Sequence, residues 1–137
     1  AQSAIAKAGA EQYMTQIQEI QDEQKAVADM ISRARDLQNE AKNADSDLST
    51  MPDDMIKSFE DRGLKFDKTG DLKTHNAEEW DYNIKSLTDY QQTISNDTQT
   101  LMVYLQDFMG QYNSYLQGAN SAISQSTQTL TTLATGR

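Results

Sequence analysis

Residues 80–133 read WDYNIKSLTDYQQTISNDTQTLMVYLQDFMGQYNSYLQGANSAISQSTQTLTTL. Two series of mostly apolar positions run through this stretch, and each series repeats every seven residues. A heptad repeat sustained over this length predicts a coiled-coil helix. Asn76 and Glu79 form a capping-box pattern just before it, so we expect the helix to cover residues 77–134. Such a helix would be roughly 85 Å long and needs a long packing partner.

A second, weaker heptad series lies in the first third of the chain and predicts a helix over residues 3–47. Because a second long helix can cover the apolar stripe of the first, we predict an all-α fold. The fold would be a long antiparallel two-helix coiled-coil hairpin that forms a single unit over residues 1–137. The predicted seam between the helices consists of Tyr13, Ile17, Ile20, Val27, Ile31, Trp80, Ile84, Leu87 and Ile94.

Residues 48–76 are predicted to form the connector, because they hold the only proline of the chain and two of its glycines. A proline suits the first turn of a helix, so we expect a short helix over residues 52–62, with Ser49 and Thr50 as capping candidates. Gly63 is placed to end that helix in a left-handed conformation.

Composition excludes several classes of function. The net charge of −9 argues against binding to nucleic acid and to anionic membrane surfaces. The chain has no cysteine and no apolar run long enough for a membrane span. His75, the only histidine, is expected to be an exposed residue beside a helix cap. We therefore predict no enzyme activity, no catalytic or metal-binding residues and no cofactor.

The segment 101–116 is apolar almost all round the expected helix. Some of its apolar residues fall on the seam. Those expected to lie off it are Met102, Val103, Tyr104, Met109 and Leu116. Either the connector wraps this end of the helix, or neighbouring subunits pack against it, and we expect the second. The predicted self-assembly interface consists of Leu101, Met102, Val103, Tyr104, Leu105, Phe108, Met109, Tyr112, Tyr115 and Leu116.

No charged residue lies between Phe108 and Gly136. An exposed helix normally needs charge for solubility, so this surface is expected to be covered in the working state. Polar residues also interrupt the seam. They either set the register and number of partners, or weaken the hairpin so that it can exchange partners. These residues are Gln24, Gln38, Gln91, Thr98 and Ser126.

The connector over residues 50–67 reads TMPDDMIKSFEDRGLKFD. Its proline, acidic pair, Ile56 close to Phe59, glycine and apolar–Asp pair resemble the connector of the EspA and SseB proteins of bacterial type III secretion systems. The resemblance covers the whole chain in architecture and these 18 residues in motif. Members carry an N-terminal export segment, which is not seen from Ala1 onward.

The resemblance implies a secreted structural subunit that polymerises into an extracellular filament on the needle, the conduit for translocators and effectors. Its expected partners are copies of itself, a small helical secretion chaperone that covers the long C-terminal helix, and needle and translocator proteins. No direct membrane insertion is expected. The alternatives are a needle-tip protein, or a soluble helical adaptor or chaperone that binds one partner helix.

Overall fold

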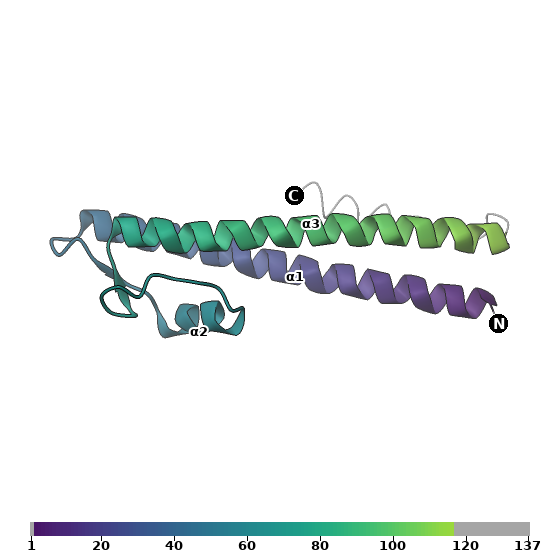
Figure 1. Ribbon diagram of the computed structural model, residues 1–137, viewed down its shortest axis with the longest axis horizontal. Helices are drawn as coiled ribbons and strands as arrows, with labels where there is room; N and C mark the ends of the chain where they lie inside the picture. The colour runs from purple at the N-terminus through teal and green to yellow at the C-terminus, as the bar shows by residue number, and fades with distance from the viewer. Residues whose placement is uncertain (1, 117–137) are drawn as a thin grey trace. The chain divides into compact units, whose positions relative to one another are not determined.

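The computed structural model describes the backbone of residues 2–116 and the side chains of residues 8–111 and 113. Two long helices pack against each other, and a short helix and a small β-hairpin lie in the connector between them (Figure 1). This arrangement confirms the predicted fold class. The elements, in order, are α1 (Gln2–Asn43), β1 (Ser49–Thr50), α2 (Asp53–Asp61), β2 (Thr74–His75) and α3 (Ala77–Leu116).

Contacts divide the chain into two compact units. One, the connector unit, comprises Lys25–Thr93, and the other, the helix-pair unit, comprises residues 1–24 together with the chain from Ile94 onward. Both long helices contribute to both units. Each unit has buried apolar side chains of its own and is described separately below.

The first helix is shorter than predicted. It ends at Asn43 rather than at residue 47. The backbone N–H of Asp47 donates to the carbonyl of Ala44 over 3.0 Å, and Asp47 adopts a φ of 58°. This positive φ is incompatible with a continuing α-helix, although a short polar residue such as aspartate tolerates it. A tight turn therefore takes the four residues that the heptad pattern assigned to the helix.

β1 and β2 form a two-stranded antiparallel ladder that the sequence did not predict. Ser49 pairs with His75, and Thr50 pairs with Thr74. The assignment of Ser49 and Thr50 as helix caps is wrong, because these residues are β1. Pro52 instead occupies the N-cap position of α2, without a capping side chain. A two-residue strand shows no measurable sequence period, and this explains why it was missed.

α2 ends as the sequence predicts. Gly63 has a φ of 64°, its N–H donates to the carbonyl of Glu60 over 3.0 Å, and the N–H of Leu64 donates to the carbonyl of Phe59 over 2.9 Å. This bond pair is the Schellman motif. The ring of Phe59 lies 5.2 Å from that of Phe66, centroid to centroid, and both side chains are buried. The connector therefore has an apolar core of its own.

The capping box at the start of α3 is also confirmed. The N–H of Glu79 donates to Oδ1 of Asn76, and the N–H of Asn76 donates to Oε1 of Glu79, both over 2.8 Å. α3 begins at Ala77 as predicted and continues to Leu116, where the described backbone ends. The rest of the helix predicted over 77–134 lies outside the described residues.

Candidate functional site

The core of the helix-pair unit takes up much of the predicted assembly segment. Met102, Leu105 and Met109 are at most 7% exposed and form one apolar cluster with residues of α1. Leu101 and Phe108 are partly buried against that cluster. The α1 residues of the cluster are Ala10 and Ile17, with Tyr13 and Met14 partly buried beside them.

The expectation that Met102 and Met109 lie off the seam is wrong. The buried positions Ile94, Thr98, Met102 and Leu105 are spaced by four, four and three residues. An eleven-residue spacing corresponds to about 3.67 residues per turn, which is closer to a straight α-helix than the 3.5 of a strict heptad. The face that packs on α1 therefore shifts by one residue at this point.

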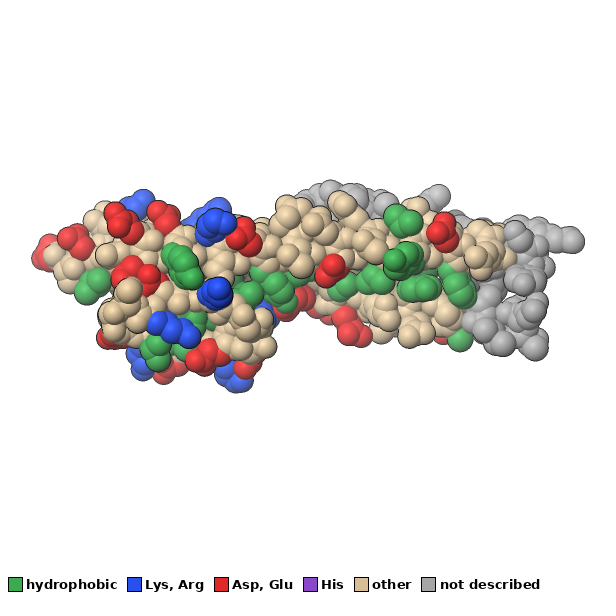
Figure 2. Space-filling model, in the orientation of Figure 1, with side chains coloured by type: hydrophobic (Ala, Val, Ile, Leu, Met, Phe, Trp, Pro, Cys, Tyr) green, Lys and Arg blue, Asp and Glu red, His purple; other side chains and the backbone are tan. Residues whose placement is uncertain are grey.

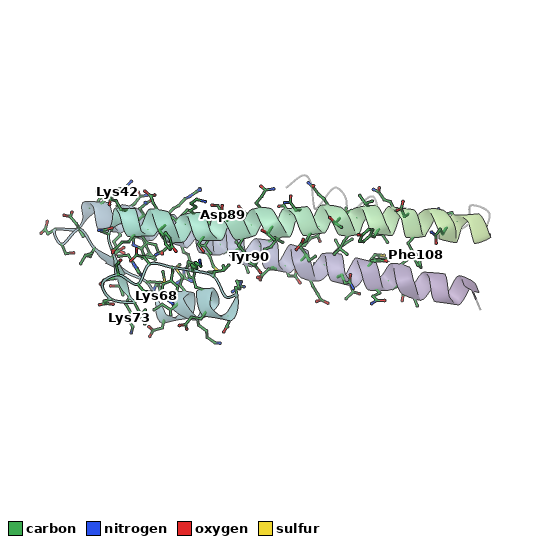
Figure 3. The ribbon with its side chains drawn as sticks, in the orientation of Figure 1. Lys42, Lys68, Lys73, Asp89, Tyr90 and Phe108 are labelled. Carbon is green, nitrogen blue, oxygen red and sulfur yellow. The ribbon has the colours of Figure 1, made fainter. Side chains whose placement is uncertain are left out.

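Phe108 is held by a close approach of the two helices. Its ring packs edge-on against that of Tyr13, with the centroids 5.8 Å apart. A Cβ atom placed on Gly9 would lie 2.5 Å from Cζ of Phe108, so only glycine leaves room for the ring there. Phe108 is labelled on α3 in Figure 3. This contact is part of the helix-pair unit and partly buries the phenyl ring.

Two residues of the predicted interface remain exposed. Val103 is 54% exposed and Tyr104 is 52% exposed. Figure 2 shows hydrophobic side chains at the surface of the later half of α3. The side chains of Tyr112, Tyr115 and Leu116 lie outside the described part of the structure. The assembly interface thus stays a prediction, and the exposed pair Val103–Tyr104 is its accessible part among the described side chains.

All members of the predicted hairpin seam are buried or partly buried. The buried members are Ile17, Val27, Ile31, Trp80, Leu87 and Ile94. Partly buried are Tyr13, Ile20 and Ile84. Among the polar seam residues, Nε2 of Gln24 donates to Oγ1 of Thr98 over 3.5 Å, and Nε2 of Gln38 donates to the carbonyl of Ala77 over 2.8 Å. These bonds favour a role for the polar residues in setting the register.

A buried polar network joins the connector to α3. Trp80 Nε1 donates to Oγ of Ser49 over 2.9 Å, and that hydroxyl donates to the carbonyl of Leu37 over 2.5 Å. Asn83 is fully buried, and its Oδ1 accepts a hydrogen bond from the N–H of Asp67 over 2.6 Å. Each of these hydrogen bonds replaces one to water, whereas Nδ2 of Asn83 is buried without a partner among the described residues.

His75 is not exposed, contrary to the expectation from the sequence. Its side chain is completely buried and packs edge-on against Trp80, with the ring centroids 5.2 Å apart. The β1–β2 pairing causes this burial, because it turns His75 toward the connector core. Nearby, hydrogen bonds from the side chain and the backbone of Thr69 hold the pKa of Asp67 below its usual value.

A shallow groove of about 440 Å³ lies between the segment 63–65 and α3. Tyr82 and Tyr90 line it, together with the ion pair in which Nζ of Lys85 lies 2.8 Å from Oδ2 of Asp89. Asp89 and Tyr90 are labelled on α3 in Figure 3. The hydrogen bond from Lys85 to the Asp89 carboxylate raises the pKa of Lys85.

Sequence reasoning missed the network of Ser49, His75 and Asn83. A heptad reading places Asn83 beside the seam as an ordinary surface residue, and its contact exists only because the connector folds back onto α3. The one local signal was the capping box, which fixes where α3 starts and so places Trp80 and Asn83 one turn or more inside the helix.

No family model, curated protein or solved structure matches this chain. Among the described residues, no helix combines the length and the hydrophobicity that a membrane span requires.

Proposed function

We propose that this protein is a secreted, non-enzymatic structural subunit of a bacterial type III secretion apparatus. In this proposal its long helices assemble many copies into an extracellular filament on the needle, through which translocators and effectors pass. The helical hairpin and the connector sequence over residues 50–67 support the proposal. The observation that carries it is the exposed pair Val103–Tyr104 on α3.

A single exposed apolar residue needs no explanation, but this pair has an unusual setting. The neighbouring apolar residues Met102 and Leu105 are already used in packing on α1, so the pair is additional to what the hairpin needs. It also lies just before the charge-free part of the chain that starts after Phe108. Exposed apolar surface that the hairpin itself does not use favours burial against a protein partner.

Each long helix of a hairpin buries one of its faces against the other helix. Assembly with further copies requires a second apolar face on the same helix. Val103 and Tyr104 are neighbours in sequence and thus about 100° apart around the helix axis. Together they offer apolar contact over a wide arc of α3. In a filament, copies of the same helix would cover this arc. Before export, a small helical chaperone would cover it and keep the subunit monomeric.

The test replaces both residues in one variant, Val103→Glu with Tyr104→Glu, and follows polymer growth by light scattering and negative-stain microscopy. Neither side chain belongs to the core, so helix content by circular dichroism should match the parent. The expected result is loss of polymers. Met102 and Met109 do not suit this test, because substituting them disrupts the hairpin core.

The matched control is Gln99→Glu with Thr100→Glu, which adds the same two charges to exposed polar positions one turn earlier. This control should still polymerise. If the Val103–Tyr104 variant polymerises like the parent, the interface is elsewhere. If the parent itself stays a monomer, a dimer or a 1:1 complex at every concentration, the protein is an adaptor and not a filament subunit.

A further inference from the structure

Three potential ligand groups meet in the connector unit. One carboxylate oxygen of Asp67, one ring nitrogen of His75 and one carboxylate oxygen of Glu79 all lie within 4.8 Å of one another. The three residues come from different elements: Asp67 from the loop after α2, His75 from β2, and Glu79 from the first turn of α3. The fold, and not sequence proximity, therefore brings the loop carboxylate to the other two groups.

One ring nitrogen of His75 is available as a ligand. Its Nε2 lies 3.1 Å from the carbonyl of Leu72, which can only accept, so Nε2 carries the proton in that contact. Nδ1 then has a free lone pair. It is fully buried, and no hydrogen-bond partner reaches it from the described part of the chain. Buried polar atoms normally have a partner, so an unpaired Nδ1 on a ring that has a nitrogen within 4.8 Å of two carboxylate oxygens indicates a missing ligand.

The carboxylates also retain free acceptor capacity. The bonds from the backbone and side chain of Thr69 both go to Oδ1 of Asp67. Oε1 of Glu79 accepts the capping bond from Asn76. Oε2 lies 3.3 Å from Oγ1 of Thr69, whose single proton is already donated to Asp67. Each carboxylate oxygen can accept about two bonds, so both groups have a lone pair available.

We propose that Asp67, His75 and Glu79 bind a divalent transition-metal ion, Zn²⁺ in preference to Mg²⁺ or Ca²⁺. Imidazole nitrogen and carboxylate oxygen are both ligands that zinc binds, and water would complete the coordination. Ligand atoms around a tetrahedral zinc lie about 3.4 Å apart, so each pair would close by at most about 1.4 Å. The contact of Nε2 with Leu72 fixes the tautomer that presents Nδ1 to the metal.

The bound ion would tie the connector loop to the start of α3. It would neutralise two carboxylates that otherwise repel each other and would satisfy the buried Nδ1 of His75. The proposal concerns the connector unit alone and does not depend on the assembly proposed above.

The experiment uses the untagged full chain, in which His75 is the only histidine. Isothermal titration with ZnCl₂ should give one ion per chain, and saturating ZnCl₂ at about 100 times the Kd should raise the Tm by about 5 °C or more. MgCl₂ and CaCl₂ should do neither. CoCl₂ should give visible d–d absorption bands that ZnCl₂ displaces.

The variants are chosen to keep the fold. Glu79→Gln can still accept the capping bond from Asn76, and Asp67→Asn can still accept from Thr69. Each should weaken zinc binding at least about tenfold, since even residues that only support metal ligands cost 10–100-fold. Asp71→Asn is the control, because Asp71 is an exposed acid of the same loop outside the cluster.

Binding that is lost in Glu79→Gln and Asp67→Asn and kept in Asp71→Asn supports the site. His75→Phe, which keeps a ring against Trp80, should abolish binding as well. The proposal is overturned if the parent shows no heat and no Tm shift with 1 mM ZnCl₂. It is equally overturned if the two cluster variants bind zinc as tightly as the parent.

Discussion

The contact between Gly9 and Phe108 decides whether replacing Gly9 by alanine stabilises or destabilises the protein. In most helix interiors Gly→Ala stabilises the protein by about 1 kcal/mol, because glycine loses more backbone entropy on folding. Gly9 lies within α1, yet an added Cβ would meet three ring atoms of Phe108 at 2.5, 2.8 and 3.2 Å. Two of these distances are shorter than side-chain carbons tolerate, so the ring or the helix must move.

The ring is not free to turn away at no cost, since its edge contact with Tyr13 places it between the helices. Forcing extra atoms into a packed site costs about 1–3 kcal/mol. We therefore expect Gly9→Ala to be neutral or to destabilise the protein by up to about 2 kcal/mol. The propensity gain of about 1 kcal/mol is included in this range.

Gly110→Ala is the matched control. Gly110 is an exposed residue of α3, and a Cβ atom placed there meets nothing within 4 Å. It should therefore show the full propensity gain of about 1 kcal/mol. Urea unfolding followed by circular dichroism at 222 nm measures both variants, and their difference isolates the overlap with the ring.

A double variant sharpens this test. Phe108→Leu removes the distal ring atoms that approach Gly9, so Gly9→Ala should become stabilising in that background. If Gly9→Ala stabilises the parent as much as Gly110→Ala does, the two helices do not approach each other closely at this point. The close packing of Phe108 against Gly9 in the helix-pair core would then be refuted.

Two further predictions concern the connector unit. Ser49→Ala should cost about 1–3 kcal/mol in urea unfolding, because it leaves Nε1 of Trp80 buried without an acceptor. The cost should fall in a Trp80→Phe background, and an unchanged cost would mean that the bond does not contribute. The second prediction concerns acid. A hydrogen bond from Arg33 lowers the pKa of Asp54 from its ordinary 3.8, so the folded state binds this proton less readily than the unfolded state. The stability that the pair adds is therefore present above about pH 4 and is lost as the pH falls through the lowered pKa. Urea unfolding midpoints measured between pH 2.5 and 7 should fall less steeply with decreasing pH for Asp54→Asn than for the parent. Identical pH profiles would contradict the ion pair between Arg33 and Asp54.

Local sequence patterns determined several elements correctly. The capping box at Asn76 and Glu79 gave the start of α3, and Gly63 gave the end of α2, because both signals depend on backbone groups only a few residues away. The heptad series predicted two long helices and most of their buried residues for a similar reason. Helical periodicity is a property of a single segment and needs no knowledge of its partner.

What the sequence could not supply are the contacts between segments far apart in the chain. The burial of His75 depends on the pairing of β1 with β2, whose residues are about 25 positions apart. The cluster of Asp67, His75 and Glu79 depends in turn on that pairing and on the loop that follows α2.

The long stretch that begins at Trp80 shows both sides of this division. Its sequence alone predicted a helix with an apolar face, and the structure confirms the helix as far as Leu116. Only the tertiary structure decided that Met102 and Met109 belong to that face while Val103 and Tyr104 stay exposed. The physical reason is that a heptad is an approximation to 3.6 residues per turn. Where the heptad series falls out of step with the true helical period, packing against the partner helix determines which of two neighbouring residues is buried.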